Sequence, residues 1–371
     1  MKVAVLGSGG GALAVAADFS RSTRDTVLAD LPEFAGNLQA VSSRGGVVVK
    51  AGWHGDDLQP VAVADVASAV DGAGLVAVVV PCFGHEPFAR TLAPLVTDEQ
   101  SVLFLGEGSG AIVAHRVFAD AGKHQVVVGE TNTLPYLARP VGPGTVTVDR
   151  KSGGVLLAAI PRPAARGLVA LIEDVWPYVT EAESVWETVL VNFNAIDHVA
   201  TMLANAGTLE NRSGGMLLWG EGATPSVVRV IEAVDEELLA IRAALGLADR
   251  RRYRDFLIAQ GFAPDVGADL YDVIRASKLV VSYAPTGSDA LSSRYITEDV
   301  PYALVLASSI AEATGVETPV IDGLIAIASA MLGQDFRADG RDLERLGLGG
   351  LGTEELHKFA ETGEVPDGSG K

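Results

Sequence analysis

The sequence predicts an α/β domain built on a doubly wound parallel sheet, followed by a domain made of helices alone. Two observations lead to this prediction. Up to about residue 180, short continuous apolar segments alternate with helical segments, as expected for strands that helices cover on both faces. Beyond that point strand-like segments nearly vanish and long apolar helical segments take over. We therefore expect a first domain over residues 1–182 and a helical domain over residues 183–371.

The bulk composition is that of a folded protein that does not bind nucleic acid. Hydrophobic residues make up 48% of the 371 residues, enough for a core in each domain. The formal net charge of −19 repels a phosphate backbone. The longest apolar runs fall far short of the roughly 20 residues that span a bilayer, and no leader-like segment opens the chain. With Cys82 as its single cysteine, the chain is expected to be cytoplasmic, without a membrane partner.

The strand candidates fall into two groups. The first five are continuous apolar runs and are expected to form the parallel sheet. The last two have shorter connections and are expected at an antiparallel edge of that sheet. In chain order, the candidates are residues 2–6, 26–30, 75–80, 101–105, 125–128, 144–148 and 155–159.

The first strand candidate runs into a glycine-rich turn that opens a helix. Gly7, Gly9 and Ala12 match the pattern GxGxxA. Gly7 permits the tight turn, Gly9 lets the backbone approach a pyrophosphate, and the small Ala12 lets the helix pack on the strand. This context indicates a Rossmann-type dinucleotide-binding domain, although a bare glycine turn without a ligand is the alternative in a chain with 42 glycines. The residues expected at the pyrophosphate are Gly7, Ser8, Gly9, Gly10, Gly11 and Ala12.

The next strand candidate ends in Asp30, about 20 residues on, where an acidic residue binds the adenosine ribose. A carboxylate there repels a 2′-phosphate and favours NAD(H), while Arg21 and Arg24 nearby in sequence leave NADP(H) as the alternative. Pro81 follows the carboxyl end of the third strand candidate. Ligands bind at the carboxyl ends of strands in open sheets, so Pro81 is assigned to the cofactor site. His85 is expected in a surface loop. No metal site is predicted.

A second glycine-rich segment, residues 106–110, follows the fourth strand candidate. It either lines the nicotinamide end of the cofactor site or is a plain strand-to-helix turn.

The helical domain shows clear start and stop signals. One long helix is expected over residues 183–206, before Gly207. The pairs Thr224-Pro225 and Thr318-Pro319 each supply an N-cap and a first-turn proline, and their helices are expected to end before glycines 246 and 333. Further helices are expected over residues 250–259, 265–276 and 300–313.

His198 lies in the middle of the apolar helix expected over residues 183–206. At 100° per residue, Asn194, His198, Thr201 and Asn205 fall within a sector of about 60°. Such a polar stripe either satisfies other buried polar groups or faces a cleft, and the residues alone leave both interpretations open.

A second polar cluster contains Arg294 and Asp299. A carboxylate such as Asp299 can orient a protonated histidine, and an arginine can clamp a substrate carboxylate with two hydrogen bonds. The alternative is an acidic cap on the following helix, with Arg294 in a surface ion pair.

In combination, these motifs resemble the opine dehydrogenase family, which includes octopine dehydrogenase and bacterial N-(1-carboxyethyl)-norvaline dehydrogenase. The resemblance extends over nearly the whole chain. It is carried by Asn194-Ala-Ile-Asp-His198, Asn205-Ala-Gly207, Arg294-Tyr-Ile-Thr-Glu-Asp299-Val-Pro and the stretch from Gly333-Gln-Asp-Phe-Arg337 through Leu346-Gly347-Leu348. It implies a helical domain similar to that of 6-phosphogluconate dehydrogenase. It also implies a reductive condensation: an amino acid and a 2-oxo acid such as pyruvate form an imine, which NAD(P)H reduces to a secondary-amine dicarboxylate.

The resemblance also implies roles for individual residues. His198 is the general acid/base and Asp299 its partner, while Asn194 helps to position the polarised group. Arg294 holds the carboxylate of the oxo acid. Asn132 and Thr133, at the carboxyl end of a strand candidate, are expected to contact substrate.

Two other functions stay open on the sequence. A hydroxy-substrate dehydrogenase of the glycerol-3-phosphate or 6-phosphogluconate type has the same domain order, but usually carries a catalytic lysine on the long helix. This chain has no lysine between Lys151 and Lys278. A dinucleotide-binding sensor would bind the cofactor without consuming it. The apolar helical domain is compatible with a homodimer.

Overall fold

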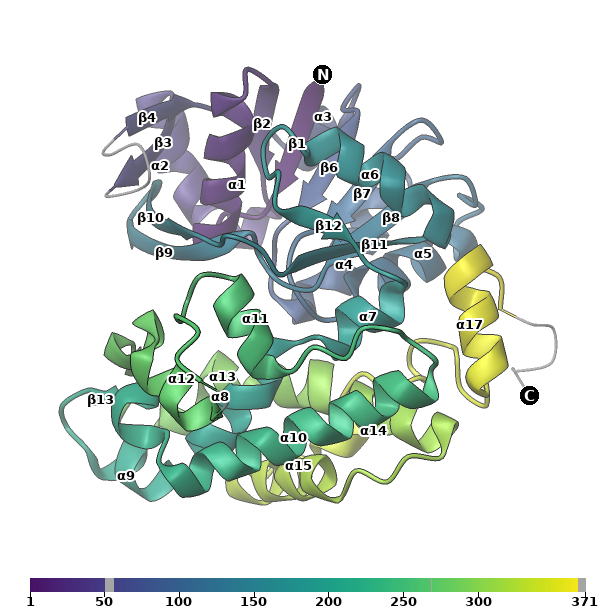
Figure 1. The fold of residues 1–371 in the computed structure, drawn as a ribbon. Coiled ribbons are helices and arrows are strands. Elements are labelled where there is room, and N and C mark those ends of the chain that lie inside the picture. The colour runs from purple at the N-terminus through teal and green to yellow at the C-terminus, as the bar shows by residue number, and fades with distance from the viewer. Residues whose placement is uncertain (51–56, 268, 366–371) are drawn as a thin grey trace. The chain divides into compact units, whose positions relative to one another are not determined.

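The computed structural model describes residues 1–50, 57–267 and 269–365 (Figure 1). The chain divides into two compact units. The first contains Met1–Lys151, Val155–Thr188 and Ala360–Gly363, and the second contains Ser152–Gly154, Val189–Phe359 and the residues from Glu364 onward. No helix within the described ranges has the length and apolarity needed to cross a membrane.

The main sheet of the first unit has the strand order β12-β11-β8-β7-β6-β1-β2-β5. Each neighbouring pair in the spatial run β8-β7-β6-β1-β2-β5 is parallel, which confirms the doubly wound parallel sheet. The strand β11 runs antiparallel to β8, as expected for residues 155–159, but the edge position expected for it is taken by β12. The strands are β1 (Lys2–Leu6), β2 (Asp25–Ala29), β5 (Ala62–Val63), β6 (Leu75–Val78), β7 (Ser101–Phe104), β8 (Val127–Thr131), β11 (Val155–Ile160) and β12 (Val179–Glu181).

The connections of this sheet place β1 between β2 and β6. The chain therefore leaves β1 toward one side of the sheet and later returns to its other side. Such a reversal of strand order creates a crevice at the carboxyl ends of the strands, where ligands bind in open α/β sheets. The helices of this unit are α1 (Gly10–Arg21), α2 (Gly36–Arg44), α3 (Val66–Val70), α4 (His85–Leu92), α5 (Gly110–Asp120) and α6 (Ala165–Ile172).

A second sheet in the same unit has the order β4-β3-β10-β9 and packs against α1. The expectation that residues 144–148 lie at the edge of the main sheet is wrong, because a turn at Gly144 pairs β10 antiparallel with β9 instead. β10 also pairs parallel with β3. The strands are β3 (Gly46–Lys50), β4 (Asp57–Pro60), β9 (Tyr136–Gly142) and β10 (Thr145–Arg150).

The helix α1 lies in the core of the first unit. Its Leu13 and Phe19 belong to a buried cluster that includes Val5 of the main sheet and Val146 of the second sheet. Trp176 joins this cluster and donates a hydrogen bond from Nε1 to Asp18 Oδ2 at 3.0 Å. Because α1 is buried in this cluster, the glycine turn at its start is held in place.

Where it is described, the second unit consists of helices, their connections and a short ribbon of β13 (Met216–Leu217) and β14 (Tyr283–Ala284). The helices that begin at Pro225 and Pro319 are confirmed, and the Thr224 side chain caps the first of them. The helices are α8 (Phe193–Ala204), α9 (Ala206–Asn211), α10 (Pro225–Ala244), α11 (Tyr253–Ala259), α12 (Leu270–Ala276), α13 (Arg294–Thr297), α14 (Val305–Thr314), α15 (Pro319–Leu332) and α16 (Phe336–Asp339). α7 (Val185–Leu190) and α17 (Thr353–Thr362) contain residues of both units.

Two helix predictions in this region need correction. The continuous helix over residues 183–206 is wrong: Asn192 adopts an extended backbone, and its side chain accepts the N–H of Ala195 at 3.2 Å. The asparagine therefore starts α8 as a new helix. The helix expected over residues 300–313 begins with a wide π-type turn over Val300–Leu304 and becomes α-helical at Val305.

Candidate active site

The glycine turn between β1 and α1 combines tight packing with one open position. Gly7 has φ +118°, and a Cβ atom there would lie 2.4 Å from the Val79 carbonyl oxygen, so only glycine fits. A Cβ on Gly10 would lie 2.9 Å from Pro140. At Gly9, by contrast, a Cβ would meet nothing of the described chain within 4 Å. The small residue at this position therefore leaves room beside the α1 N-terminus, which is where a pyrophosphate binds in dinucleotide-binding turns.

Asp30 follows β2 directly and lies beside this turn. Its Oδ1 accepts the N–H of Leu31 at 2.8 Å, and Ser8 also hydrogen-bonds to it. Burial raises the pKa of Asp30, and these hydrogen bonds oppose the rise. The turn itself is tied to the next loop, because Asn37 Nδ2 donates to the Ser8 carbonyl oxygen at 2.7 Å and Ser8 Oγ donates to that of Phe34 at 2.8 Å.

Arg21 and Arg24 do not lie at the same end of β2 as Asp30. They belong to the end of α1 and the following connection, which enter β2 at its amino end. Arg21 pairs with Asp18 at 3.2 Å, and Arg24 pairs with Asp174 at 2.6 Å. These two arginines therefore lend no support to NADP(H), because each pairs with an aspartate and both precede β2, whereas Asp30 follows it.

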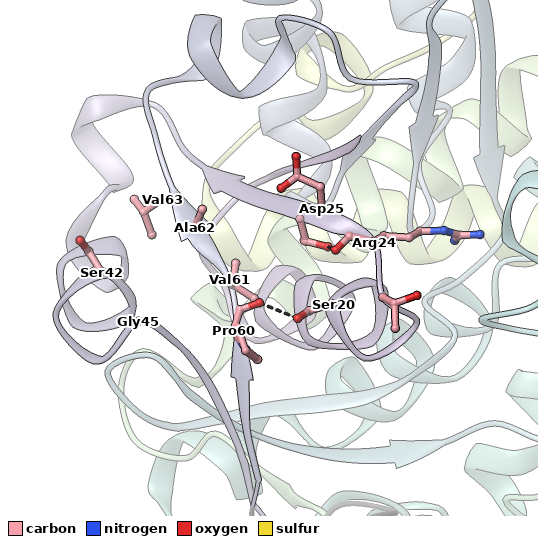
Figure 2. A pocket seen from close by; sticks show the side chains of 11 residues that line it. Ser20, Arg24, Asp25, Ser42, Gly45, Pro60, Val61, Ala62 and Val63 are labelled. Atoms are coloured by element: carbon pink, nitrogen blue, oxygen red, sulfur yellow. Dashed lines mark hydrogen bonds between the residues drawn. The ribbon is translucent and has the colours of Figure 1, made fainter. Parts of the chain in front are cut away.

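A surface depression of about 770 Å³ lies at this amino end (Figure 2). It is formed by the α1–β2 connection, the end of α2 and the β4–β5 connection, and Ser20 Oγ donates to the Pro60 carbonyl oxygen across it at 2.5 Å. Arg24 lines it, but its described lining contains none of the residues assigned from the sequence to the cofactor or substrate site.

The turns that follow β6 and β7 pack against each other at the carboxyl edge. Pro81 is half-buried after β6, and a Cβ on Gly108 of the second glycine segment would lie 2.3 Å from Cys82 Sγ. The expectation that His85 sits in a surface loop is wrong. His85 is 3% exposed and packs edge-on against Phe104 at 5.2 Å, because it starts the amphipathic helix α4 on its buried face.

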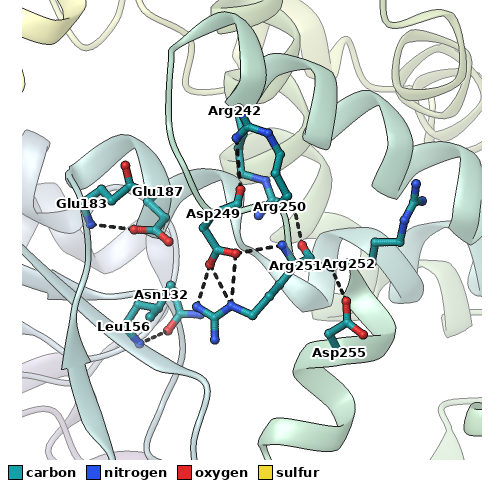
Figure 3. A network of polar contacts seen from close by, with 10 residues as sticks. All are labelled: Asn132, Leu156, Glu183, Glu187, Arg242, Asp249, Arg250, Arg251, Arg252 and Asp255. Atoms are coloured by element: carbon teal, nitrogen blue, oxygen red, sulfur yellow. Dashed lines mark hydrogen bonds and ion pairs between the residues drawn. The ribbon is translucent and has the colours of Figure 1, made fainter.

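The residues after β8 have different environments. Asn132 is fully buried, and its Oδ1 accepts the N–H of Leu156 at 2.8 Å (Figure 3). This placement ties β8 to β11 and does not support substrate contact by Asn132. Thr133 is half-buried, and its Oγ1 accepts a hydrogen bond from Lys151 Nζ at 2.6 Å. Burial lowers the pKa of Lys151 to about 7, and sequence reasoning gave this lysine no role.

In the second unit, the structure brings His198 and Asp299 together across 101 residues of sequence. His198 is on α8 with 8% of its surface exposed, and its Nδ1 lies 2.8 Å from Asp299 Oδ2. Burial raises the pKa of Asp299, while the hydrogen bond and the charge of His198 oppose the rise. Tyr295 stacks on the imidazole with ring centroids 4.1 Å apart. Asn194 is half-buried one turn earlier on the same face of α8.

Arg294 is at the start of α13 with 66% of its side chain exposed. Its Nε donates to the carboxylate of Glu298, one turn later and buried. The surface ion pair considered from the sequence is therefore present. It keeps the guanidinium on the segment that also carries Tyr295 and Asp299.

Sequence reasoning missed the buried groups around the histidine. Asp197 is 3% exposed, and its Oδ2 accepts hydrogen bonds from Trp219 Nε1 at 2.6 Å and from the Tyr253 hydroxyl at 2.5 Å. The only signal for Asp197 was its adjacency to His198. Trp219 and Tyr253 come from other elements, and no signal in the sequence connected them with His198. Elsewhere in this unit, the polar contacts of Figure 3 include the pair of Asp249 with Arg251 at 2.6 Å.

Comparison with known proteins relates both units to one family. The model of the alpha-helical domain of NAD/NADP octopine/nopaline dehydrogenases matches residues 181–332. An opine dehydrogenase of Arthrobacter sp. (strain 1C) is 31% identical over 350 residues, covering 94% of this chain and 95% of that protein.

Solved structures extend the comparison to the fold. A structure of octopine dehydrogenase with NADH and agmatine superposes with a TM-score of 0.79 at 21% identity, covering 98% of both chains. Another, with NADH and pyruvate, has a TM-score of 0.75 at 21% identity and covers 94% of this chain and 95% of that one. These likenesses confirm a Rossmann-type domain followed by a helical domain. The chain belongs to the opine dehydrogenase family and is an NAD(P)-dependent oxidoreductase of the CH–NH-acting type.

Proposed function

We propose that this protein condenses the amino group of an amino acid with a 2-oxo acid such as pyruvate and reduces the product to a secondary-amine dicarboxylate. The buried pair of His198 and Asp299, 2.8 Å apart on the helical unit, is the observation that carries the proposal. The substrate classes are supported by the related octopine dehydrogenase structures, which contain agmatine or pyruvate with NADH.

The residues at the carboxyl edge of the first unit fit a dinucleotide. Gly7, Gly9 and the N-terminus of α1 would hold the pyrophosphate, and Asp30 would bind the ribose hydroxyls. A carboxylate at that position favours NAD(H) over NADP(H). The bound cofactor supplies the hydride that reduces the carbon–nitrogen double bond. Pro81 would border the cofactor after β6.

His198 would move the protons of the condensation. Because Asp299 occupies Nδ1, Nε2 is the ring atom available to substrate. Protonated His198 donates from Nε2 to the carbonyl oxygen as the neutral amine adds, which gives a hydroxyl group. A second proton, lost by the attacking nitrogen, lets that hydroxyl leave as water and forms the protonated carbon–nitrogen double bond. Asp299 accepts the Nδ1–H and stabilises the imidazolium. In the reverse direction, neutral His198 takes the proton back.

Three further residues complete the proposed site. The exposed guanidinium of Arg294 would bind the carboxylate of the oxo acid. Asn194, on the face of α8 that carries His198, would position the polarised group. Thr133, half-buried after β8, is a further candidate for substrate contact.

The direct test follows NADH absorbance with pyruvate alone, with each amino acid alone, and with both. We expect consumption only when both substrates are present, and a secondary amine in the product by mass spectrometry. Consumption with pyruvate alone would identify a simple oxo-acid reductase and overturn the proposal. Binding of NADH without consumption under any of these conditions would identify a sensor.

A further inference from the structure

The imidazole of His198 is bordered by more negative charge than Asp299 alone supplies. Asp197 Oδ1 lies 3.9 Å from Nε2, on the side of the ring opposite the Asp299 contact. Glu298 and Asp197 both act electrostatically on Asp299. Two carboxylates, Asp197 and Asp299, therefore lie beside the imidazole, and Glu298, which pairs with Arg294, acts on Asp299 from behind.

Asp197 is fixed in this position by two donors from other elements. Its Oδ2 accepts the Trp219 Nε1–H at 2.6 Å and the Tyr253 hydroxyl at 2.5 Å. Both bonds favour the ionised carboxylate, while burial opposes it and raises the pKa of Asp197. With Oδ2 held in this way, Oδ1 is the oxygen directed toward His198. Trp219 also borders the imidazole, with ring centroids 5.7 Å apart.

The separation of 3.9 Å decides what Asp197 can do. It is too long for a hydrogen bond, so Asp197 does not take the Nε2 proton. It is short enough for a strong interaction between charges inside a protein. Asp299 orients the ring through Nδ1, whereas Asp197 places a negative charge near Nε2, the ring atom that exchanges a proton with substrate.

Three acidic groups on α10 and α15, which both pack against α8, are engaged elsewhere. On α10, Asp235 accepts the backbone N–H of Tyr253, and Glu237 accepts the first N–H groups of α15. On α15, Asp322 binds Ser308 and Arg337. Among the described residues, Asp197, Tyr295 and Asp299 lie beside the imidazole, Tyr253 hydrogen-bonds to Asp197, and Glu298 acts on Asp299.

We propose that Asp197 is a positioning residue that stabilises protonated His198 from the Nε2 side and leaves the Nε2 proton available to substrate. The inference rests on the acid/base role of His198 in the proposed function. Condensation needs the protonated histidine and oxidation of the product needs the neutral one. By keeping His198 protonated to higher pH, Asp197 therefore extends the pH range of condensation upward. It also lowers the rate of product oxidation at low pH.

The kinetic test measures kcat/KM against pH for Asp197→Asn in both directions. The basic limb of condensation is expected to move to lower pH by about one unit, because one neighbouring charge has been removed. The acidic limb of product oxidation is expected to move the same way, so that oxidation at acidic pH becomes faster than in the wild type. Loss of rate in both directions without movement of either limb would overturn the proposal, since a merely structural role predicts that result.

A second readout needs no activity. In the full chain without substrates, the imidazole Cε1–H signal that His198→Gln removes is titrated by NMR. We expect its midpoint to fall by about one unit in Asp197→Asn and by less in Tyr253→Phe, which removes one donor from Asp197. Asp235→Asn is the matched control, a buried aspartate of the same unit, and is expected to leave the midpoint unchanged.

An unchanged midpoint in Asp197→Asn contradicts the inference. If that variant does not fold, Tyr253→Phe decides the question in the same way. A shifted midpoint in a protein that does not couple amine and oxo acid would refute the proposed function and leave the electrostatic role of Asp197 standing. The two failures are therefore distinguishable.

Discussion

The hydrogen bond and the stacking contact of the His198 imidazole come from a segment far away in sequence. Asp299 reaches Nδ1 from 101 residues further on, and Tyr295 of the same segment covers the ring face. This short segment thus supplies both a hydrogen bond and a stacking contact to the ring, and Trp219 and Asp197 lie further from it. This arrangement makes the protonation state of His198 sensitive to single substitutions nearby.

Replacement of His198 separates proton transfer from cofactor binding. His198→Ala is expected to lower kcat for condensation by at least about 100-fold, because general acid/base groups contribute 100- to 10,000-fold. The dissociation constant for NADH should stay within about twofold, since the residue lies in the helical unit. His124→Ala replaces an exposed histidine of the first unit and is the matched control, expected to keep both kcat and the NADH dissociation constant. Equal loss of turnover and NADH affinity would assign His198 a structural role.

Replacement of Arg294 tests the carboxylate clamp. Arg294→Ala is expected to raise the KM for the oxo acid by about 10- to 100-fold, because two charge-assisted hydrogen bonds to the substrate carboxylate are lost. The KM for the amino acid should change much less. Arg294→Lys retains the charge but loses the planar fork, so it should recover only part of the effect. An oxo-acid KM that does not change would remove Arg294 from the clamp and leave it as the partner of Glu298.

The residues of the site differ in how far their roles could be predicted from the sequence. His198 and Asp299 could be named because both stand in segments that resemble a known family. Asp197 could not be given a role, because its geometry depends on Trp219 and Tyr253, which no spacing connects with it. Asn132 was assigned to substrate from its place after a strand, yet its amide serves the backbone of β11. Which way a polar side chain turns at a strand end is decided by the packing of neighbouring strands.

At the scale of elements, long apolar runs were predictable and short strands were not. β1, β6 and β7 are buried along nearly their whole lengths, so their hydrophobic runs identify them. The strands β4, β5, β9 and β12 are very short or carry polar residues, and each lies at an edge of its sheet. β3 was missed although its segment, GVVVK, is largely apolar. The break between α7 and α8 was hidden, since apolar residues continue through it and only the side chain of Asn192 restarts the helix.

The glycine turn permits a matched pair of variants within one element. Gly7→Ala is expected to lower the free energy of unfolding by about 2 kcal/mol, because φ is +118° and the new Cβ would lie 2.4 Å from the Val79 carbonyl oxygen. Gly9→Ala should fold normally, since φ is −73° and nothing of the described chain lies within 4 Å of the new Cβ. Its dissociation constant for NADH should rise about tenfold if a pyrophosphate approaches there.

Urea denaturation and fluorescence titration with NADH check the pair. The expected pattern is a crossed one: a stability defect in Gly7→Ala and a binding defect in Gly9→Ala. Full NADH affinity in Gly9→Ala would show that the pyrophosphate does not approach this position.

For the whole molecule, negative charge is both abundant and partly buried. The formal net charge is −19, and buried aspartates of both units, among them Asp30, Asp197, Asp235 and Asp299, have raised pKa values. A carboxyl group with a raised pKa binds its proton more tightly in the folded state than in the unfolded one. The stability that it contributes is present at low pH and is lost as the pH rises through the folded-state pKa.

Asp235 makes this effect measurable at one position. Burial raises its pKa from 3.8 to about 6, so the folded state carries an unfavourable buried charge at pH 8 and a neutral group below about pH 4. Asp235→Asn keeps an acceptor for the Tyr253 N–H but cannot ionise. We expect the variant to exceed the wild type in free energy of unfolding by about 1–2 kcal/mol at pH 8, with the difference vanishing toward pH 4. Urea denaturation at a series of pH values measures it, and a difference that stays constant with pH would mean that Asp235 has no raised pKa in the folded protein.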